Sequence, residues 1–178
     1  MKIGIDISQL AYPETGVANY LEHLIGYLIE KDRKNEYVLF FSSLRKEFPI
    51  SNFKFPISSP KVQIKIFKIP PTILDLLWNK LHIMPIESFI GPVDLFITSD
   101  WTEPPAKAKK ATIVYDLIVY KYPKETDKKI VETQKRKLKW VKKESDLIFT
   151  ISKSSKKDVE EILGIESNKI KVIYPGIG

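Results

Sequence analysis

The fold is decided by the opening stretch of the chain, MKIGIDISQLAYPETGVANYLEHLIGYLI (residues 1–29). Lys2 to Ile7 is a short apolar run, which predicts a β-strand, and a polar loop follows it. From Val17 to Ile29 the apolar side chains recur at the spacing of one helical face, which predicts a helix. The chain therefore opens with a strand, a loop and a helix, the arrangement from which α/β domains are built.

The same alternation continues along the chain. Further strands are predicted at Tyr37 to Phe41, Val62 to Ile69, Val93 to Thr98, Thr112 to Tyr115, Leu147 to Ser152 and Ile170 to Tyr174. Helices are predicted at Thr72 to His82, where Ile73, Leu76, Leu77 and Leu81 have helical spacing, at Lys124 to Glu144, and in a last segment ending at Gly164. Ser42 to Pro60 is interpreted as a long loop. This alternation predicts a Rossmann-like, doubly wound α/β domain with a mostly parallel sheet of about seven strands and helices on both faces.

Composition excludes several classes of protein. The chain has no cysteine, which rules out disulfides, thiolate metal sites and a cysteine nucleophile, and its two histidines leave little for zinc. It contains no apolar run long enough to span a membrane, and its first strand reaches Asp6 too early for a signal peptide. We therefore expect a cytoplasmic protein, and the absence of a recognition-helix or aromatic–basic pattern argues against a nucleic-acid partner.

The net charge of +7 comes from the second part of the chain. Residues 101–178 carry 18 basic and 11 acidic side chains, whereas residues 1–100 carry 11 of each. Eight of the basic residues crowd the predicted helix Lys124 to Glu144, namely Lys128, Lys129, Lys135, Arg136, Lys137, Lys139, Lys142 and Lys143. Such a helix either attracts an anionic surface, which would make the protein peripheral at the inner face of a membrane, or presents an ordinary solvated face.

Loops that follow the predicted strands carry candidate binding residues, because ligands of such sheets bind at the carboxyl ends of the strands. Gly16 precedes the first helix, whose first free amides are expected at Val17, Ala18 and Asn19, and free helix amides bind phosphate or sugar hydroxyls. The alternative is a glycine that only permits a turn. No G-x-G-x-x-G pattern is present, which argues against a nicotinamide or flavin enzyme.

Trp101 follows another predicted strand, within Thr98 to Pro105. Its indole either stacks on a sugar ring or packs on the domain, with Ser99 or Asp100 making local turn bonds.

Tyr115 and Asp116 end the next predicted strand, and Ser152 ends a later one. Neighbours on an extended chain point in opposite directions, so Tyr115 and Asp116 are not expected to form a catalytic pair. Asp116 either orients a sugar hydroxyl or caps the segment after it. Ser152 or Ser155 is expected to cap the last helix.

These pieces, in this order and at this spacing, resemble the N-terminal domain of the retaining glycosyltransferases known as group 1 or family 4. The resemblance covers nearly the whole chain through a set of short motifs. They are Lys2 to Asp6 as the first strand, Gly16-Val17-Ala18-Asn19-Tyr20 like the family's G-I-G-R-Y, Val114-Tyr115-Asp116-Leu117 like its H-D-L strand end, Tyr122-Pro123, Thr150 to Ser155, and Val172 to Gly176.

The resemblance implies one half of a GT-B enzyme, in which two Rossmann-like domains face each other across a cleft. Residues 1–174 would form the acceptor-side domain, residues 175–178 would begin the interdomain linker, and the donor-binding domain would lie outside this chain. The implied reaction transfers a hexose, with retention, from a nucleotide diphosphate sugar to a glycan or lipid-linked acceptor, without a metal or other cofactor. The isolated domain is then expected to be inactive.

The expected substrate contacts are Gly16, Val17, Ala18, Asn19, Trp101, Tyr115, Asp116 and Ser152. No residue of the chain is assigned a catalytic role. Ala18 replaces the second glycine of the family's loop, and Tyr115 replaces the histidine associated with the transferred sugar. A phenol donates a hydrogen bond but does not take up a proton near neutral pH, so the histidine's role does not carry over. The competing interpretation is a stand-alone Rossmann-like binding module with a basic face for anionic partners.

Overall fold

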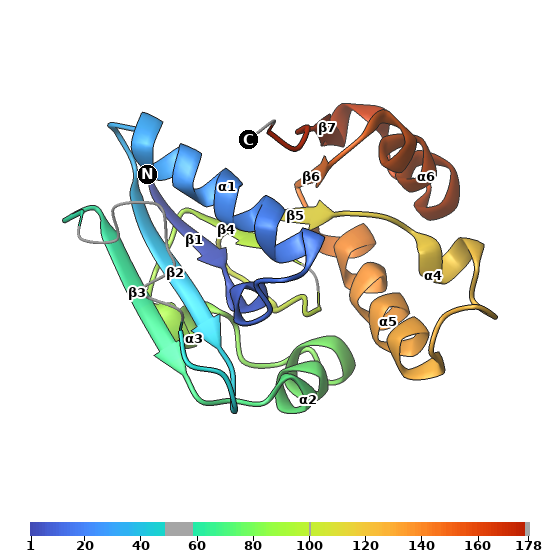
Figure 1. Ribbon diagram of the computed structural model, residues 1–178, viewed down its shortest axis with the longest axis horizontal. Helices are drawn as coiled ribbons and strands as arrows, with labels where there is room; N and C mark the ends of the chain where they lie inside the picture. The colour runs from blue at the N-terminus through green and yellow to red at the C-terminus, as the bar shows by residue number, and fades with distance from the viewer. Residues whose placement is uncertain (49–58, 100, 177–178) are drawn as a thin grey trace.

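A seven-stranded, entirely parallel sheet forms the centre of the protein (Figure 1). The computed structural model describes residues 1–48, 59–99 and 101–176. The order across the sheet is β3-β2-β1-β4-β5-β6-β7. The strands are β1 (Lys2–Asp6), β2 (Glu36–Ser42), β3 (Val62–Phe67), β4 (Leu95–Thr98), β5 (Lys109–Val114), β6 (Leu147–Thr150) and β7 (Ile170–Val172).

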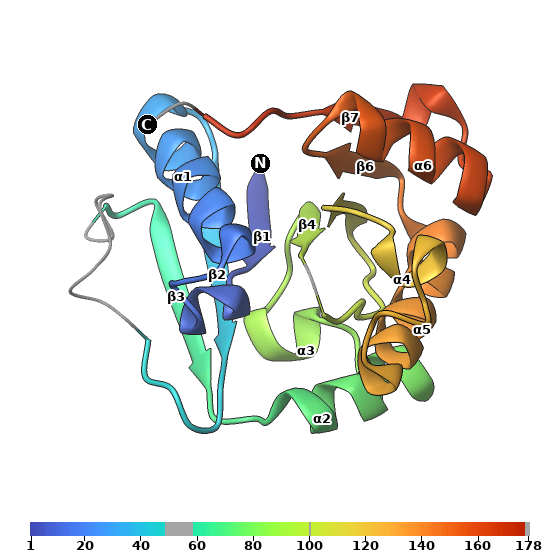
Figure 2. The ribbon, with the colours of Figure 1, turned by 45° about the vertical axis from the view of Figure 1, so that its right-hand side comes forward.

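Helices connect these strands and lie over the sheet. The longer ones are α1 (Gly16–Lys31), α5 (Lys128–Glu144) and α6 (Lys153–Leu163). The shorter ones are α2 (Pro71–Leu74), α3 (Glu87–Ile90), α4 (Ile118–Lys121), the 3-10 helices η1 (Ser8–Ala11) and η4 (Ser167–Lys169), and the π-helix η3 (Asp75–Lys80). In Figures 1 and 2, α2 lies beyond the carboxyl ends of β2 and β3.

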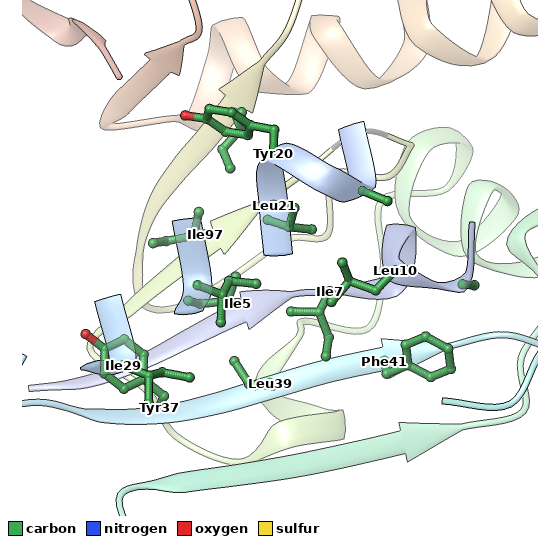
Figure 3. Packing of buried hydrophobic residues seen from close by; sticks show 14 of the residues in the cluster. Ile5, Ile7, Leu10, Tyr20, Leu21, Ile29, Tyr37, Leu39, Phe41 and Ile97 are labelled. Carbon is green, nitrogen blue, oxygen red and sulfur yellow. The ribbon is translucent and has the colours of Figure 1, made fainter. Parts of the chain in front are cut away.

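Helices cover both faces of the sheet, and alternating strand residues supply the contacts. On one face, Ile5, Leu39 and Ile97 belong to a buried cluster with Leu21 and Ile25 of α1 (Figure 3). On the other face, the intervening residues pack against different helices. That second cluster consists of Val38, Phe40, Leu74, Trp78, Ile86, Ile90 and Phe96. A third cluster joins β6 and β7 to α5 and α6. The doubly wound α/β fold predicted from the sequence is confirmed.

The order of the strands creates a switch point between β1 and β4. From β1 the chain continues to β2 on one side, whereas β4 pairs with β1 on the other side. The loops that leave β1 and β4 therefore run in opposite directions and leave a crevice between them, which is where open α/β sheets bind ligands.

All seven predicted strands are present, and each differs from its predicted bounds by a few residues at most. Several helical features differ from expectation. The basic helix begins at Lys128 rather than Lys124, because Asp127 caps it by accepting hydrogen bonds from the backbone N–H groups of Lys129 and Ile130. The short helices α3 and α4 were not predicted, since four residues are too few to show a helical period. Most of the predicted loop Ser42 to Pro60 lies outside the described residues.

The predicted helix Thr72 to His82 divides into α2 and the π-helix η3. An apolar stripe on a helix normally faces the core. Here Leu74, Trp78 and Asn79 are buried instead. Most of the stripe with helical spacing faces solvent, since Ile73, Leu76 and Leu81 are exposed.

Candidate functional site

Three hollows meet around the start of α1 at the carboxyl edge of the sheet, and the third continues along α1 as far as Glu30. Val17 lines all three, Trp101 lines the first and second, and Tyr115 and Asp116 line the second and third. Their volumes are about 490, 270 and 1140 Å³. Gly16 and Asn19 lie on the third hollow, so six of the eight predicted contacts border this connected region. Ala18 and Ser152 border none of the three hollows.

The first hollow occupies the switch point of the sheet. The loop after β1, the end of β2, helix α2 and the loop after β4 form its walls. Its lining residues are Asp6, Ser8, Gln9, Tyr12, Thr15, Val17, Ser42, Ser43, Pro71, Leu74, Trp101 and Thr102. Carbon atoms form much of the wall while hydroxyl, amide and carboxyl groups interrupt it, a composition that suits a ligand with both apolar and hydrogen-bonding parts.

Asp6 contributes a carboxylate to this hollow, and it was not among the residues predicted from the sequence. It ends β1 and is 6% exposed. Its Oδ1 accepts a hydrogen bond of 2.9 Å from the Ser8 backbone N–H. Burial raises the pKa of Asp6 above its usual value, although the Ser8 hydrogen bonds and the charge of Lys137 oppose that rise. The signal available in the sequence was a carboxylate at the end of an otherwise apolar strand.

The N-terminus of α1 differs in one respect from the prediction. Thr15 caps the helix, and its Oγ1 accepts a hydrogen bond of 3.2 Å from the Ala18 N–H, while the Asn19 N–H donates to the Thr15 carbonyl. The amides of Ala18 and Asn19 are therefore hydrogen-bonded, whereas the sequence had predicted them to be free. Among the described residues, none accepts a hydrogen bond from the N–H of Gly16 or Val17. A Cβ added to Gly16 would meet no atom within 4 Å, so the space next to it is open.

Trp101 stands between the first and second hollows and is partly exposed. Its carbonyl accepts a hydrogen bond of 2.9 Å from the Asn79 side chain. The partly exposed ring is available to a ligand on either side, as stacking on a sugar requires. Asp100, which the sequence placed in a turn here, lies outside the described residues.

A buried polar network fixes the loop that carries Trp101. Glu103 is fully buried and accepts hydrogen bonds from Thr98 Oγ1 at 2.6 Å and from Thr112 Oγ1 at 3.0 Å. The Nζ of Lys110 lies 3.0 Å from Glu103 Oε1. The Glu103 N–H donates to Asn79, whose side chain also holds Trp101. Because both ends of the loop are bonded to rigid elements, the position of Trp101 is set by the fold.

Lys137 reaches the same loop from α5. It is 2% exposed, and its Nζ donates a hydrogen bond to the Ser99 carbonyl. One of the eight basic residues expected on the helix surface is thus turned inward, because its position on α5 faces the sheet. Lys137 also lines the second hollow, where it adds a positive charge close to Asp6.

Tyr115 and Asp116 point in different directions, as the extended chain predicted. Tyr115 is buried, and its hydroxyl lies 3.1 Å from Ser99 Oγ. Its ring meets the ring of Tyr20 edge-on, with centroids 5.6 Å apart. Asp116 is exposed, and its Oδ1 accepts a hydrogen bond of 3.0 Å from the Ile118 N–H. Asp116 therefore stabilises the turn into α4 while its carboxylate borders the second and third hollows.

Ser152 lies at the start of α6, where its Oγ accepts a hydrogen bond of 3.0 Å from the Ser155 N–H. It is the N-cap, and Ser155 is not. Ser155 instead donates its hydroxyl to the Tyr115 carbonyl at 2.8 Å, which ties α6 to the site. No group of three or more His, Cys, Asp or Glu side chains placed to hold a metal ion occurs in the described parts of the chain.

Comparison with known proteins gives one family. The sequence profile of the family described as Glycosyltransferase Family 4 matches residues 15–178. No curated protein matches the chain. Among the described residues, no helix combines the length and apolar character that crossing a membrane requires.

Proposed function

Because the chain belongs to glycosyltransferase family 4, we propose that it forms the acceptor-side half of an enzyme that transfers a hexose from a nucleotide diphosphate sugar. The acceptor is a glycan or a lipid-linked sugar. The observation that carries this proposal is the meeting of three hollows at the carboxyl edge of the sheet, with Val17 shared by all of them. A site made of connected hollows suits two substrates that must be brought together.

The first hollow suits the acceptor. Trp101 offers an aromatic face to a sugar ring, and Asp6 offers a carboxyl group that can accept a hydrogen bond from a hydroxyl. Sugar recognition combines such a flat apolar surface with directed polar groups, because a sugar ring has C–H groups on its faces and hydroxyls at its edge. Binding there would place an acceptor hydroxyl toward Val17 and the adjoining hollow.

The start of α1 suits the donor side of the reaction. The free N–H groups of Gly16 and Val17 lie at the positive end of the helix dipole, where a departing diphosphate is stabilised. A protein that stabilises the leaving group with helix amides and cationic side chains does not need a metal for that purpose. The remaining donor contacts would come from a second domain, and transfer would retain the configuration of the sugar.

Transfer assays with a panel of nucleotide diphosphate sugars test this proposal. The 178-residue chain alone should give no turnover, and addition of a family 4 donor-binding domain, fused or separate, should produce transfer. The anomeric configuration of the product, read by NMR, should match that of the donor. Turnover by the 178-residue chain alone would overturn the assignment as half an enzyme, and a product of inverted configuration would overturn the retaining mechanism.

A further inference from the structure

An exposed apolar ridge runs along α2, η3 and the turn after them. We define it by five side chains that are each 43–55% exposed: Ile73, Leu76, Leu81, Ile83 and Met84. Five large aliphatic side chains are exposed within twelve consecutive residues, whereas soluble proteins normally show scattered single exposures. A patch of this kind marks a surface that contacts something else.

The backbone holds this ridge outward. In η3 the π-helical register places the Leu81 N–H on the Leu76 carbonyl at 2.9 Å, so the two leucines lie one wide turn apart. His82 and Met84 then adopt positive φ angles of 53° and 60°, which non-glycine residues rarely accept. Trp78 locks this turn from below, because its buried indole donates a hydrogen bond of 3.0 Å to the Met84 carbonyl. The outward position of Ile83 and Met84 is therefore built into the fold.

Cationic side chains border the ridge on the side of α5. The His82 ring stacks on Trp140 of α5 with centroids 3.5 Å apart. The Nζ atoms of Lys139 and Lys143 lie 5.6 Å and 4.9 Å from the centre of the same Trp140 ring. Lys80, within η3, leaves half of its side chain exposed. His82, which lies between Leu81 and Ile83 in the chain, thus connects the ridge through Trp140 to Lys139 and Lys143.

Two carboxylates near this surface, Asp75 and Glu144, have cationic partners. Asp75 lies 2.8 Å from Arg136 and 3.9 Å from Lys80. Glu144 lies 3.1 Å from Lys110, which also pairs with Glu103, and 2.9 Å from His82. Lys139 and Lys143 form no ion pair within the described residues, so they supply positive charge beside the ridge, and an anionic partner is favoured.

We propose that the ridge and its bordering lysines dock the protein on an anionic lipid bilayer. Aliphatic side chains enter the boundary between headgroups and acyl chains, lysines remain at the level of the phosphates, and Trp140 lies at the interface that tryptophan favours. Protein interfaces are instead rich in tyrosine and arginine and poor in lysine. This docking does not depend on the proposed transferase activity. It uses the exposed C-terminal part of the basic helix α5 together with α2, η3 and the turn after them.

Vesicle sedimentation tests the proposal. The protein should bind vesicles that contain phosphatidylglycerol and not vesicles of pure phosphatidylcholine, and high salt should weaken the binding because the phosphates are then screened. Two double variants should each weaken binding at least about tenfold: Leu76→Ser/Ile83→Ser and Lys139→Glu/Lys143→Glu. The matched controls are Ile162→Ser, an exposed isoleucine of α6, and Lys157→Glu/Lys171→Glu, which makes the same change of charge away from the ridge.

Thermal melts of all variants should agree with that of the wild type, because every substituted side chain is exposed. Three outcomes overturn the proposal. The first is that the wild-type protein binds anionic and neutral vesicles equally at low salt. The second is that the control substitutions weaken binding as much as the ridge substitutions do. The third is a wild-type dimer that Leu76→Ser/Ile83→Ser converts to a monomer, since the ridge would then be an interface between two copies of the chain. Failure of vesicle binding leaves the transfer assay unaffected, so the two proposals are tested separately.

Discussion

Asp6 is a buried carboxylate whose ionised form is disfavoured by its burial. Two hydrogen bonds with Ser8 and the charge of Lys137 stabilise its ionised form, yet burial dominates and raises its pKa. Proteins keep such groups where a ligand uses them, and the position of Asp6 in the first hollow agrees with that explanation. The residue marks the polar end of the hollow in which we place the acceptor.

The substitution Asp6→Asn should raise the Tm of the protein at neutral pH. The folded-state pKa lies above the unfolded value, so the folded protein takes up a proton more readily and the carboxylate costs stability once it is ionised. This cost is present above the folded pKa and fades as the pH falls through that pKa toward the ordinary value for Asp. Melting curves of both proteins between pH 4 and pH 8 would show the difference narrowing in acid. A variant less stable than the wild type at pH 8 would contradict the assignment.

Most of the contact residues predicted from the sequence border the hollows, but Asp6 and Lys137, which are buried charged residues, were not predicted. Val17, Trp101 and Tyr115 follow strand ends, so a parallel sheet brings them to one edge. Asp6 was treated as part of a strand, and Lys137 as one member of a surface charge run. Whether a charged residue turns inward depends on where a helix packs, and one sequence does not contain that information.

At the level of secondary structure elements, Gly4 sets the distance between β1 and the helix beneath it. A Cβ at this position would lie 2.7 Å from Phe96 Cδ2 and 2.8 Å from Ile90 Cδ1, closer than carbon atoms pack. Both neighbours are buried, so they have little room to move.

Gly4→Ala should therefore lower the free energy of unfolding by about 1–3 kcal/mol, the usual cost of overpacking a core. Gly16→Ala is the matched control, because its Cβ would meet no atom within 4 Å. Urea denaturation of the two variants measures the difference directly. Equal stability of Gly4→Ala and Gly16→Ala would show that the sheet and α3 adjust more easily than this packing suggests.

The cap of α6 gives a second prediction for an element. Ser152→Ala removes the acceptor of the Ser155 N–H and should cost about 1 kcal/mol, whereas Ser152→Asp keeps an acceptor at the N-cap and should cost much less. Chemical denaturation compares the two. If alanine and aspartate are equally destabilising, the hydrogen bond of the cap is not what Ser152 contributes.

The sequence predicted all seven strands, but it predicted the structure of residues 72–82 only in part. A parallel sheet with helices on both faces buries whole strands, and the resulting apolar runs stand out in the sequence. In residues 72–82 the stripe at Ile73, Leu76 and Leu81 predicted a helix correctly, but the π-helical turn changes which residues share a side. A 3.6-residue period in the sequence does not reveal a π-helical turn. An apolar stripe also does not reveal whether it packs against the rest of the protein or contacts something else.

The described parts of the chain present two surfaces to which we assign a function. The connected hollows lie at the carboxyl edge of the sheet, and the apolar ridge lies on the segment that also forms one wall of the first hollow, through Pro71 and Leu74. Docking through the ridge would bring that hollow close to the membrane, and we therefore expect lipid-linked acceptors to be used in preference to soluble glycans. Competition between the two kinds of acceptor in the transfer assay, with anionic vesicles present, measures this preference.

We propose that this chain binds the acceptor beside Trp101. The indole N–H signals of its three tryptophans in an NMR titration test this binding. Trp78 serves as the internal control, since it is fully buried. Trp140 borders the apolar ridge, so a shift of its signal would report lipid contact there. With soluble oligosaccharides and short-chain lipid-linked sugars as probes, we predict that at least one acceptor shifts the Trp101 signal while the Trp78 signal stays unchanged, and that Trp101→Ala abolishes its binding. Nucleotide diphosphate sugars should produce no comparable shift. A Trp101 signal that responds to nucleotide diphosphate sugars and to none of the acceptors would contradict the claim.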